Sequence, residues 1–81
     1  MRQFNHIEDA RELRNLLASK DDAVWRQRIN DAIDYSSTGT EIIVLVSAAL
    51  VDLLEERRDL PLAIVAKARA YVQSAQKFLA T

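Results

Sequence analysis

The sequence predicts an all-α fold, a small antiparallel four-helix bundle forming a single domain over residues 1–81. The chain has one glycine and one proline among its 81 residues, so the residues that punctuate short strands and turns are scarce. Apolar residues recur at intervals of three and four in four stretches, which is the spacing of a helix face. The polar breaks between these stretches are short, and short connections are typical of antiparallel neighbours in a bundle.

The first predicted helix covers residues 6–18. Asn5 followed by Glu8 has the spacing of a capping box, so we expect Asn5 to cap this helix. A polar break follows, where Ser19 or Asp21 is expected to cap the next helix. The apolar stripe of the first helix consists of Ile7, Ala10, Leu13, Leu16 and Leu17.

The second predicted helix covers residues 22–36. Trp25 lies on its apolar face, where a core position is favoured and an interface anchor is the alternative. Val24 and Tyr35 lie on one flank and are expected to be partly exposed. The apolar face consists of Trp25, Ile29, Ala32 and Ile33, and the opposite face of Gln27, Asn30, Asp31 and Asp34.

The third predicted helix covers residues 39–57 and is the most apolar. Thr38 and Glu41 fit a capping box, and Gly39 is interpreted as a relief point for a tight reversal. The apolar stripe is broad enough to contact more than one neighbour, which predicts either the central helix or a dimer seam.

The fourth predicted helix is capped by Asp59 and has Pro61 in its first turn, where proline is tolerated. It continues through an apolar stripe to Leu79. The predicted core consists of Trp25, Ile29, Ile33, Ile43, Val46, Leu50, Leu54, Val65, Val72 and Leu79.

Composition argues against several classes of protein. The hydrophobic fraction of 49% excludes wholesale disorder. Eleven basic and 12 acidic residues give a net charge of −1, without the basic excess that nucleic-acid binders show. The most apolar run, residues 42–54, is shorter than the roughly 20 residues of a membrane span. No cysteine and no signal peptide are seen, so we expect a cytoplasmic protein that contacts neither nucleic acid nor membrane.

The side chains also argue against an enzyme. His6 is the only histidine and has no partner constellation for a metal or for general-base catalysis. The hydroxyl-rich turn before the third helix lacks the glycines and lysine of a phosphate-binding loop, so capping explains it better than a ligand site. The carboxylate pairs are interpreted as solvated surface, or as recognition of a basic partner: Asp21/Asp22, Asp31/Asp34 and Glu55/Glu56. We therefore expect no catalytic residue, metal or cofactor.

The segment VWRQRINDAIDYSSTGTEIIVLV, residues 24–46, resembles small all-helical immunity proteins of bacterial contact-dependent and polymorphic toxin systems. It looks most like the group that neutralises EndoU-type nuclease toxins, in which a Trp-containing helix, a polar turn and a long apolar helix follow one another. The resemblance implies a stoichiometric inhibitor that plugs the active site of a cognate nuclease toxin, and therefore a partner that is a basic RNase domain.

The hypothesis for the partner-binding surface is the outer face of the second helix with the adjoining turn. Asp31 and Asp34 point away from Trp25 and Ile33, so they cannot serve the core, and an acidic surface speeds encounter with a basic nuclease. The candidate residues are Asp31, Asp34, Tyr35, Ser37 and Glu41. The competing interpretation is a homodimeric helical adaptor or secretion chaperone, with the seam on the third helix near Leu45. A homodimer is expected in either case.

Overall fold

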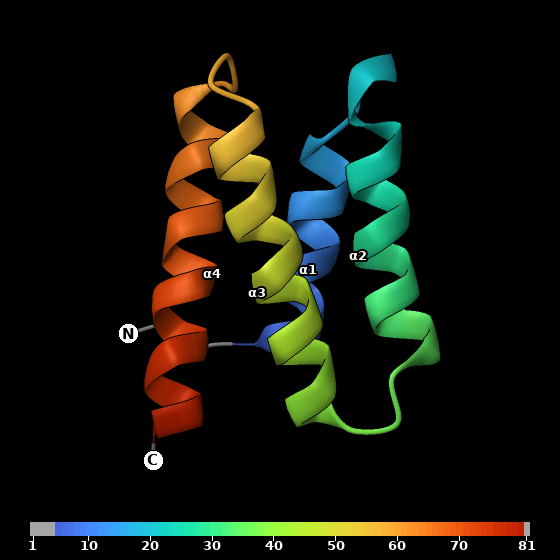
Figure 1. The fold of residues 1–81 in the computed structure, drawn as a ribbon, viewed down its shortest axis with the longest axis vertical. Coiled ribbons are helices and arrows are strands. Elements are labelled where there is room, and N and C mark those ends of the chain that lie inside the picture. The colour runs from blue at the N-terminus through green and yellow to red at the C-terminus, as the bar shows by residue number, and fades with distance from the viewer. Residues whose placement is uncertain (1–4, 81) are drawn as a thin grey trace.

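The computed structural model describes residues 5–80, which form four α-helices and no strand (Figure 1). Successive helices run in opposite directions, so the start of the first and the end of the fourth lie at the same end of the bundle (Figure 1). The predicted antiparallel four-helix bundle is therefore confirmed. The elements are α1 (His6–Leu16), a 3₁₀ turn η1 (Lys20–Asp22), α2 (Ala23–Tyr35), α3 (Gly39–Glu56) and α4 (Leu62–Ala80).

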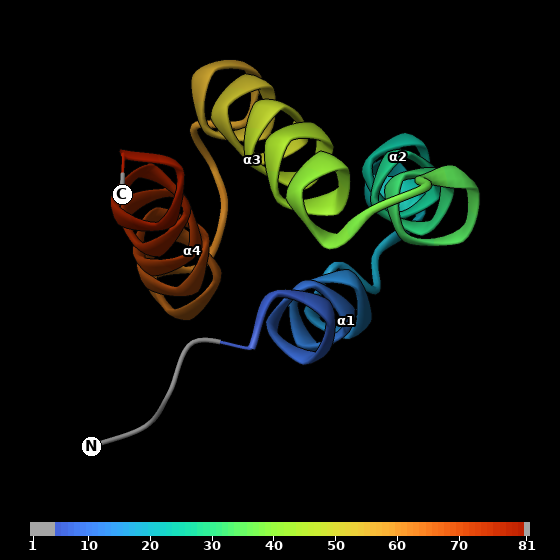
Figure 2. The same ribbon diagram turned by 90° about the horizontal axis from the view of Figure 1, so that it is seen from below.

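Helix α3 packs against each of the other three helices. Seen along the bundle, α2 and α4 occupy opposite corners, and no close backbone approach joins these two helices (Figure 2). The helices at the other two corners, α1 and α3, do contact each other across the centre of the bundle. The expectation that the broad apolar surface of α3 serves more than one neighbour is confirmed.

The core follows the predicted stripes in most positions. Five of the predicted core residues are buried: Trp25, Ile29, Ile43, Val46 and Leu50. Other residues of the predicted apolar stripes are buried with them, such as Ala10, Leu13 and Leu17 of the first predicted helix. The largest fully buried side chains are Leu13, Leu17, Ile29, Ile43, Val46, Leu50 and Leu53.

The periphery of the predicted core differs from expectation. Ile33, Leu54, Val65 and Val72 are only partly buried and pack against the edge of the core. Leu79 is 45% exposed, so its prediction as a core residue was wrong. It lies close to the end of α4, where helical periodicity still marks a face but little of the bundle remains to cover it.

Side-chain caps set three of the element starts. Asn5 Oδ1 accepts from the Glu8 amide at 3.1 Å, and Thr38 Oγ1 accepts from the Glu41 amide at 3.1 Å, as the sequence predicts. Ser19 caps η1 by accepting from the Asp21 amide at 3.2 Å. These bonds satisfy amides that have no partner within the helix.

Three details of the predicted helix starts were wrong. Helix α4 begins at Leu62, and the carbonyl of Pro61 accepts from the Val65 amide, so Pro61 precedes the helix. Asp59 does not cap this helix, because its carboxylate pairs with Arg57. No described glycine has positive φ, so Gly39 does not relieve a strained reversal. A Cβ at Gly39 would lie 3.1 Å from His6 Nε2, so its small size serves close packing against α1.

Candidate functional site

A shallow groove of about 400 Å³ runs between α2 and α3. It brings together three of the five predicted partner-binding residues, Asp31, Tyr35 and Glu41. Asp31 and Tyr35 are one turn apart on α2, so they share a face. Glu41 joins them because its amide is held by the Thr38 cap at the start of α3. The groove is lined by Arg28, Asp31, Ala32, Tyr35, Glu41, Leu45 and Ala48.

The groove combines an apolar floor with an aromatic rim. Leu45 and Ala48 supply the α3 side and are exposed, while Ala32 is buried beneath them on α2. Tyr35 is 81% exposed, so its ring stands free at the end of α2. An exposed tyrosine beside a concave apolar surface is a common anchor in protein interfaces.

The charges in the groove leave a negative excess. Among the described residues, Arg28 is the one cation that lines the groove, and its guanidinium pairs with Asp52 of α3 at 3.0 Å. Its guanidinium also lies 5.5 Å from the centre of the Trp25 ring, which fixes it against α2. Asp31 accepts a hydrogen bond from Gln27 Nε2 at 2.8 Å but has no cation partner within residues 5–80, and neither does Glu41.

The remaining two predicted residues lie outside the groove. Asp34 and Ser37 are exposed but do not line it. Sequence reasoning in turn missed Arg28, Ala32 and Ala48 as lining residues. The available signal for Arg28 is its helical spacing, which places it on the same flank of the second helix as Val24 and Tyr35.

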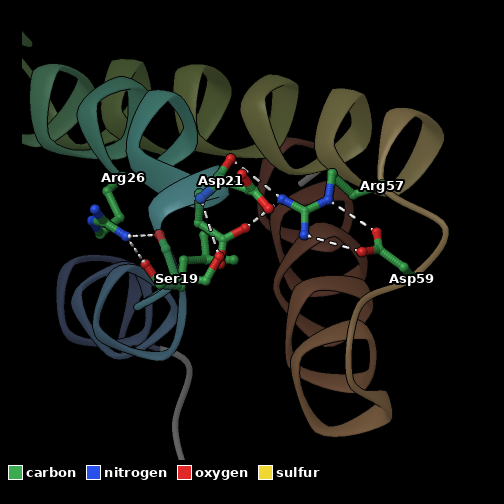
Figure 3. Close-up of polar contacts among 7 residues, drawn as sticks. Ser19, Asp21, Arg26, Arg57 and Asp59 are labelled. Carbon is green, nitrogen blue, oxygen red and sulfur yellow. Dashed lines mark hydrogen bonds and ion pairs between the residues drawn. The ribbon is translucent and has the colours of Figure 1, made fainter.

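A second polar cluster lies at the opposite end of the bundle. Arg57, directly after α3, holds Asp22 at 2.5 Å and Asp59 at 3.0 Å, and it donates to the carbonyl of Asp21 at 3.3 Å (Figure 3). Asp22 is 4% exposed, so the interpretation of the Asp21/Asp22 pair as solvated surface was wrong for Asp22. The guanidinium holds the pKa of Asp59 below its ordinary value through a hydrogen bond.

This cluster joins the α1–α2 connection to the α3–α4 connection. Nearby, Arg26 donates to the carbonyls of Leu17 and Ser19, which hold the chain as it leaves α1 (Figure 3). The contacts of Arg26 and Arg57 tie these side chains to backbone carbonyls and to one another, so we interpret the cluster as structural.

The described residues also show where His6 lies and bear on metal binding and membrane insertion. His6 is partly buried beside Gly39, and its carbonyl accepts from the Tyr71 hydroxyl at 2.9 Å. Residues 5–80 contain no group of three or more side chains suited to holding a metal ion. Among the described helices, none has both the length and the hydropathy that a bilayer crossing requires.

Comparison with known proteins returns no relative. No family model matches the chain, and neither a curated protein nor a solved structure is significantly similar to it. The candidate site therefore rests on the geometry of the α2–α3 groove.

Proposed function

We propose that the protein is an immunity protein that binds a cognate secreted nuclease toxin and neutralises it by stoichiometric occlusion in the bacterial cytoplasm. The observation that carries the proposal is the α2–α3 groove, where two carboxylates without cation partners lie beside an exposed tyrosine and a leucine. The resemblance of residues 24–46 supplies the class of partner, and this segment contains every predicted partner-binding residue.

The physical case is electrostatic first. An RNase must present positive charge where it holds RNA, and a partner with an acidic face is attracted to that surface before contact. Asp31 and Glu41 supply this charge from α2 and α3, since Arg28 is already neutralised by Asp52. The immunity protein does no chemistry in this proposal, because occlusion alone stops the toxin.

The apolar part of the groove would set how slowly the immunity protein dissociates from the toxin. Tyr35 would lose most of its 81% exposure on binding, and buried tyrosines carry a large share of interface energy. Leu45 and Ala48 give the ring a floor to pack on. Charge therefore sets mainly the association rate, and Tyr35 mainly the dissociation rate.

The test measures binding kinetics against the nuclease domain encoded beside this gene, together with protection of growing cells. Asp31→Lys plus Glu41→Lys should slow association roughly tenfold at low salt. Tyr35→Ala should raise the dissociation rate roughly thirtyfold. Asp34→Lys, which lies outside the groove, should change both rates less.

The matched control is Asp21→Lys plus Glu56→Lys, which makes the same charge change on exposed residues away from the groove. It should bind like the wild type. Full protection by the groove double variant would move the binding surface elsewhere, and no binding between the wild type and the neighbouring gene product would overturn the immunity proposal.

A homodimeric adaptor or secretion chaperone is the second candidate. The observation that favours it is the exposure of Val44, Leu45 and Val51 on the outer face of α3. In this case the adjacent toxin would not bind, and Leu45→Glu would convert a dimer to a monomer in sedimentation.

A further inference from the structure

A second groove, of about 340 Å³, lies on the other flank of α3. On this flank α3 runs beside α4 (Figures 1 and 2). The floor of this groove is apolar and its rim is charged with both signs. Val51 and Leu54 of α3 and Val72 of α4 form the floor, and the remaining lining residues are Glu55, Arg58, Arg69 and Gln73.

The apolar floor extends beyond the hollow itself. Val44 lies two helical turns before Val51 and is likewise exposed on α3. Leu79 lies two turns after Val72 on the same face of α4 and is also exposed. An apolar strip therefore follows the α3–α4 seam along most of its length.

This strip explains the main mismatch between the sequence pattern and the burial. Leu54, Val65, Val72 and Leu79 belong to stripes with the periodicity of core residues, yet each is only partly buried or exposed. All four lie on α3 and α4, and the one other predicted core residue that is only partly buried, Ile33, lies on α2. Apolar residues that have the periodicity of core residues but stay partly exposed in a single chain are typical of surfaces that bind another protein.

The charges on the rim of the groove indicate which partner could bind there. Glu55 on α3 and Arg69 on α4 both line the groove, and neither carboxylate nor guanidinium has an ionic partner among residues 5–80. A purely acidic partner would leave Glu55 facing like charge, and a purely basic one would do the same to Arg69. A second copy of this chain supplies the opposite charge to each.

We propose that the α3–α4 groove is the seam of a homodimer with its two-fold axis along the groove. This axis places α3 of one subunit over α4 of the other, and the pair is antiparallel because α3 and α4 run in opposite directions. Glu55 then faces Arg69 of the partner subunit, and symmetry repeats the pair. An axis in the interface but perpendicular to the groove would instead place α3 over α3 of the partner subunit, so Glu55 would not face Arg69 of that subunit.

The homodimer seam is independent of what binds in the acidic α2–α3 groove. The two grooves lie on opposite flanks of α3 and share no lining residue. Loss of dimerisation and loss of toxin binding are therefore separate outcomes, each measured with its own variants.

The experiment is sedimentation velocity of the full chain at micromolar concentration. The wild type should sediment at twice the 9.2 kDa mass of one chain. Glu55→Arg and Arg69→Glu should each raise the dimer dissociation constant at least about tenfold, because each places two like-charged pairs in the seam. Val51→Asp should have a similar effect by charging the apolar floor.

The decisive step is an equimolar mixture of Glu55→Arg and Arg69→Glu. In the mixed dimer the introduced arginine faces the introduced glutamate, and the native Glu55 faces the native Arg69. The mixture should therefore recover the dimer that neither variant forms alone. Damage to folding would not be repaired by mixing, and circular dichroism checks it directly.

Glu56→Arg and Lys77→Glu are the matched controls, since both residues are exposed and neither lines the groove. They should remain dimeric. A monomeric wild type, or a mixture that stays monomeric, would overturn the proposal. So would dissociation by Leu45→Glu with no effect of the two groove variants, because the seam would then lie on the α2 side of α3.

Discussion

Leu50→Ala is expected to remove a large part of the stability of the bundle. Leu50 is 0% exposed and lies in α3, the helix that packs against the other three. Its neighbours one turn away, Val46 and Leu53, are themselves fully buried, so the space left by the leucine cannot collapse easily. A substitution of this kind costs about 2–5 kcal/mol.

That cost is large for a chain of 81 residues, whose total free energy of unfolding is expected to be about 4–12 kcal/mol. The assay is urea denaturation followed by far-ultraviolet circular dichroism, with all variants at one protein concentration because dimers unfold in a concentration-dependent way. The midpoint should fall with little change in the slope, and the melting temperature should fall by about 4–8 °C for each kcal/mol lost.

Leu62→Ala is the matched control for this prediction. Leu62 begins α4 and is 85% exposed, so the same change of side chain should alter stability by no more than about 0.5 kcal/mol. A cost below about 1 kcal/mol for Leu50→Ala, or equal costs for both variants, would refute the placement of α3 at the centre of the core.

Three further predictions concern single side chains that hold the helices and their connections. Thr38→Ala removes the cap of α3 and should cost about 0.5–2 kcal/mol in urea denaturation, whereas Thr40→Ala, one residue into the helix, should cost less. In an absorbance titration Tyr71 should ionise at a higher pH than a phenol in water, because burial and then the nearby Asp9 carboxylate raise its pKa. Stability should accordingly fall at alkaline pH, since only the unfolded phenol ionises there. Arg57→Gln should lower the melting temperature at neutral pH more than Arg58→Gln. Arg57 lowers the pKa of Asp59 in the folded protein, so this pair contributes stability that is lost as the pH falls below the ordinary range of aspartate. In the Arg57→Gln variant that decline in stability with falling pH should therefore be less steep.

The parts of the fold that the sequence predicts are those with a local cause. Periodicity located all four helices, and the caps at Asn5 and Thr38 were predictable because donor and acceptor lie within one turn. The Arg57–Asp22 pair was not, since 35 residues separate its members and no sequence pattern links charges at that distance. Periodicity also cannot tell which apolar face the chain itself covers, so Leu79 was wrongly assigned to the core.

The candidate site was likewise predictable from the sequence only where its residues lie on the same helix. Asp31 and Tyr35 could be placed together from the sequence because they are one turn apart on a single helix. Their proximity to Leu45 depends on how α2 packs against α3, and Asp52, which neutralises Arg28, comes from that same packing. The electrostatic character of the groove is therefore a tertiary property.

The diagonal arrangement of the bundle has a consequence for how the chain folds. Most of the helix pairs that contact each other are consecutive in sequence, and the ring is closed by α1 against α4. That closure joins the Tyr71 hydroxyl to the carbonyl of His6 across 65 residues, and ordering a loop of that length carries a larger entropic cost than pairing neighbours. We expect α2, α3 and α4 to form the folding nucleus and α1 to dock after the transition state, so that substitutions in α1 change the unfolding rate and leave the folding rate almost unaltered in stopped-flow measurements.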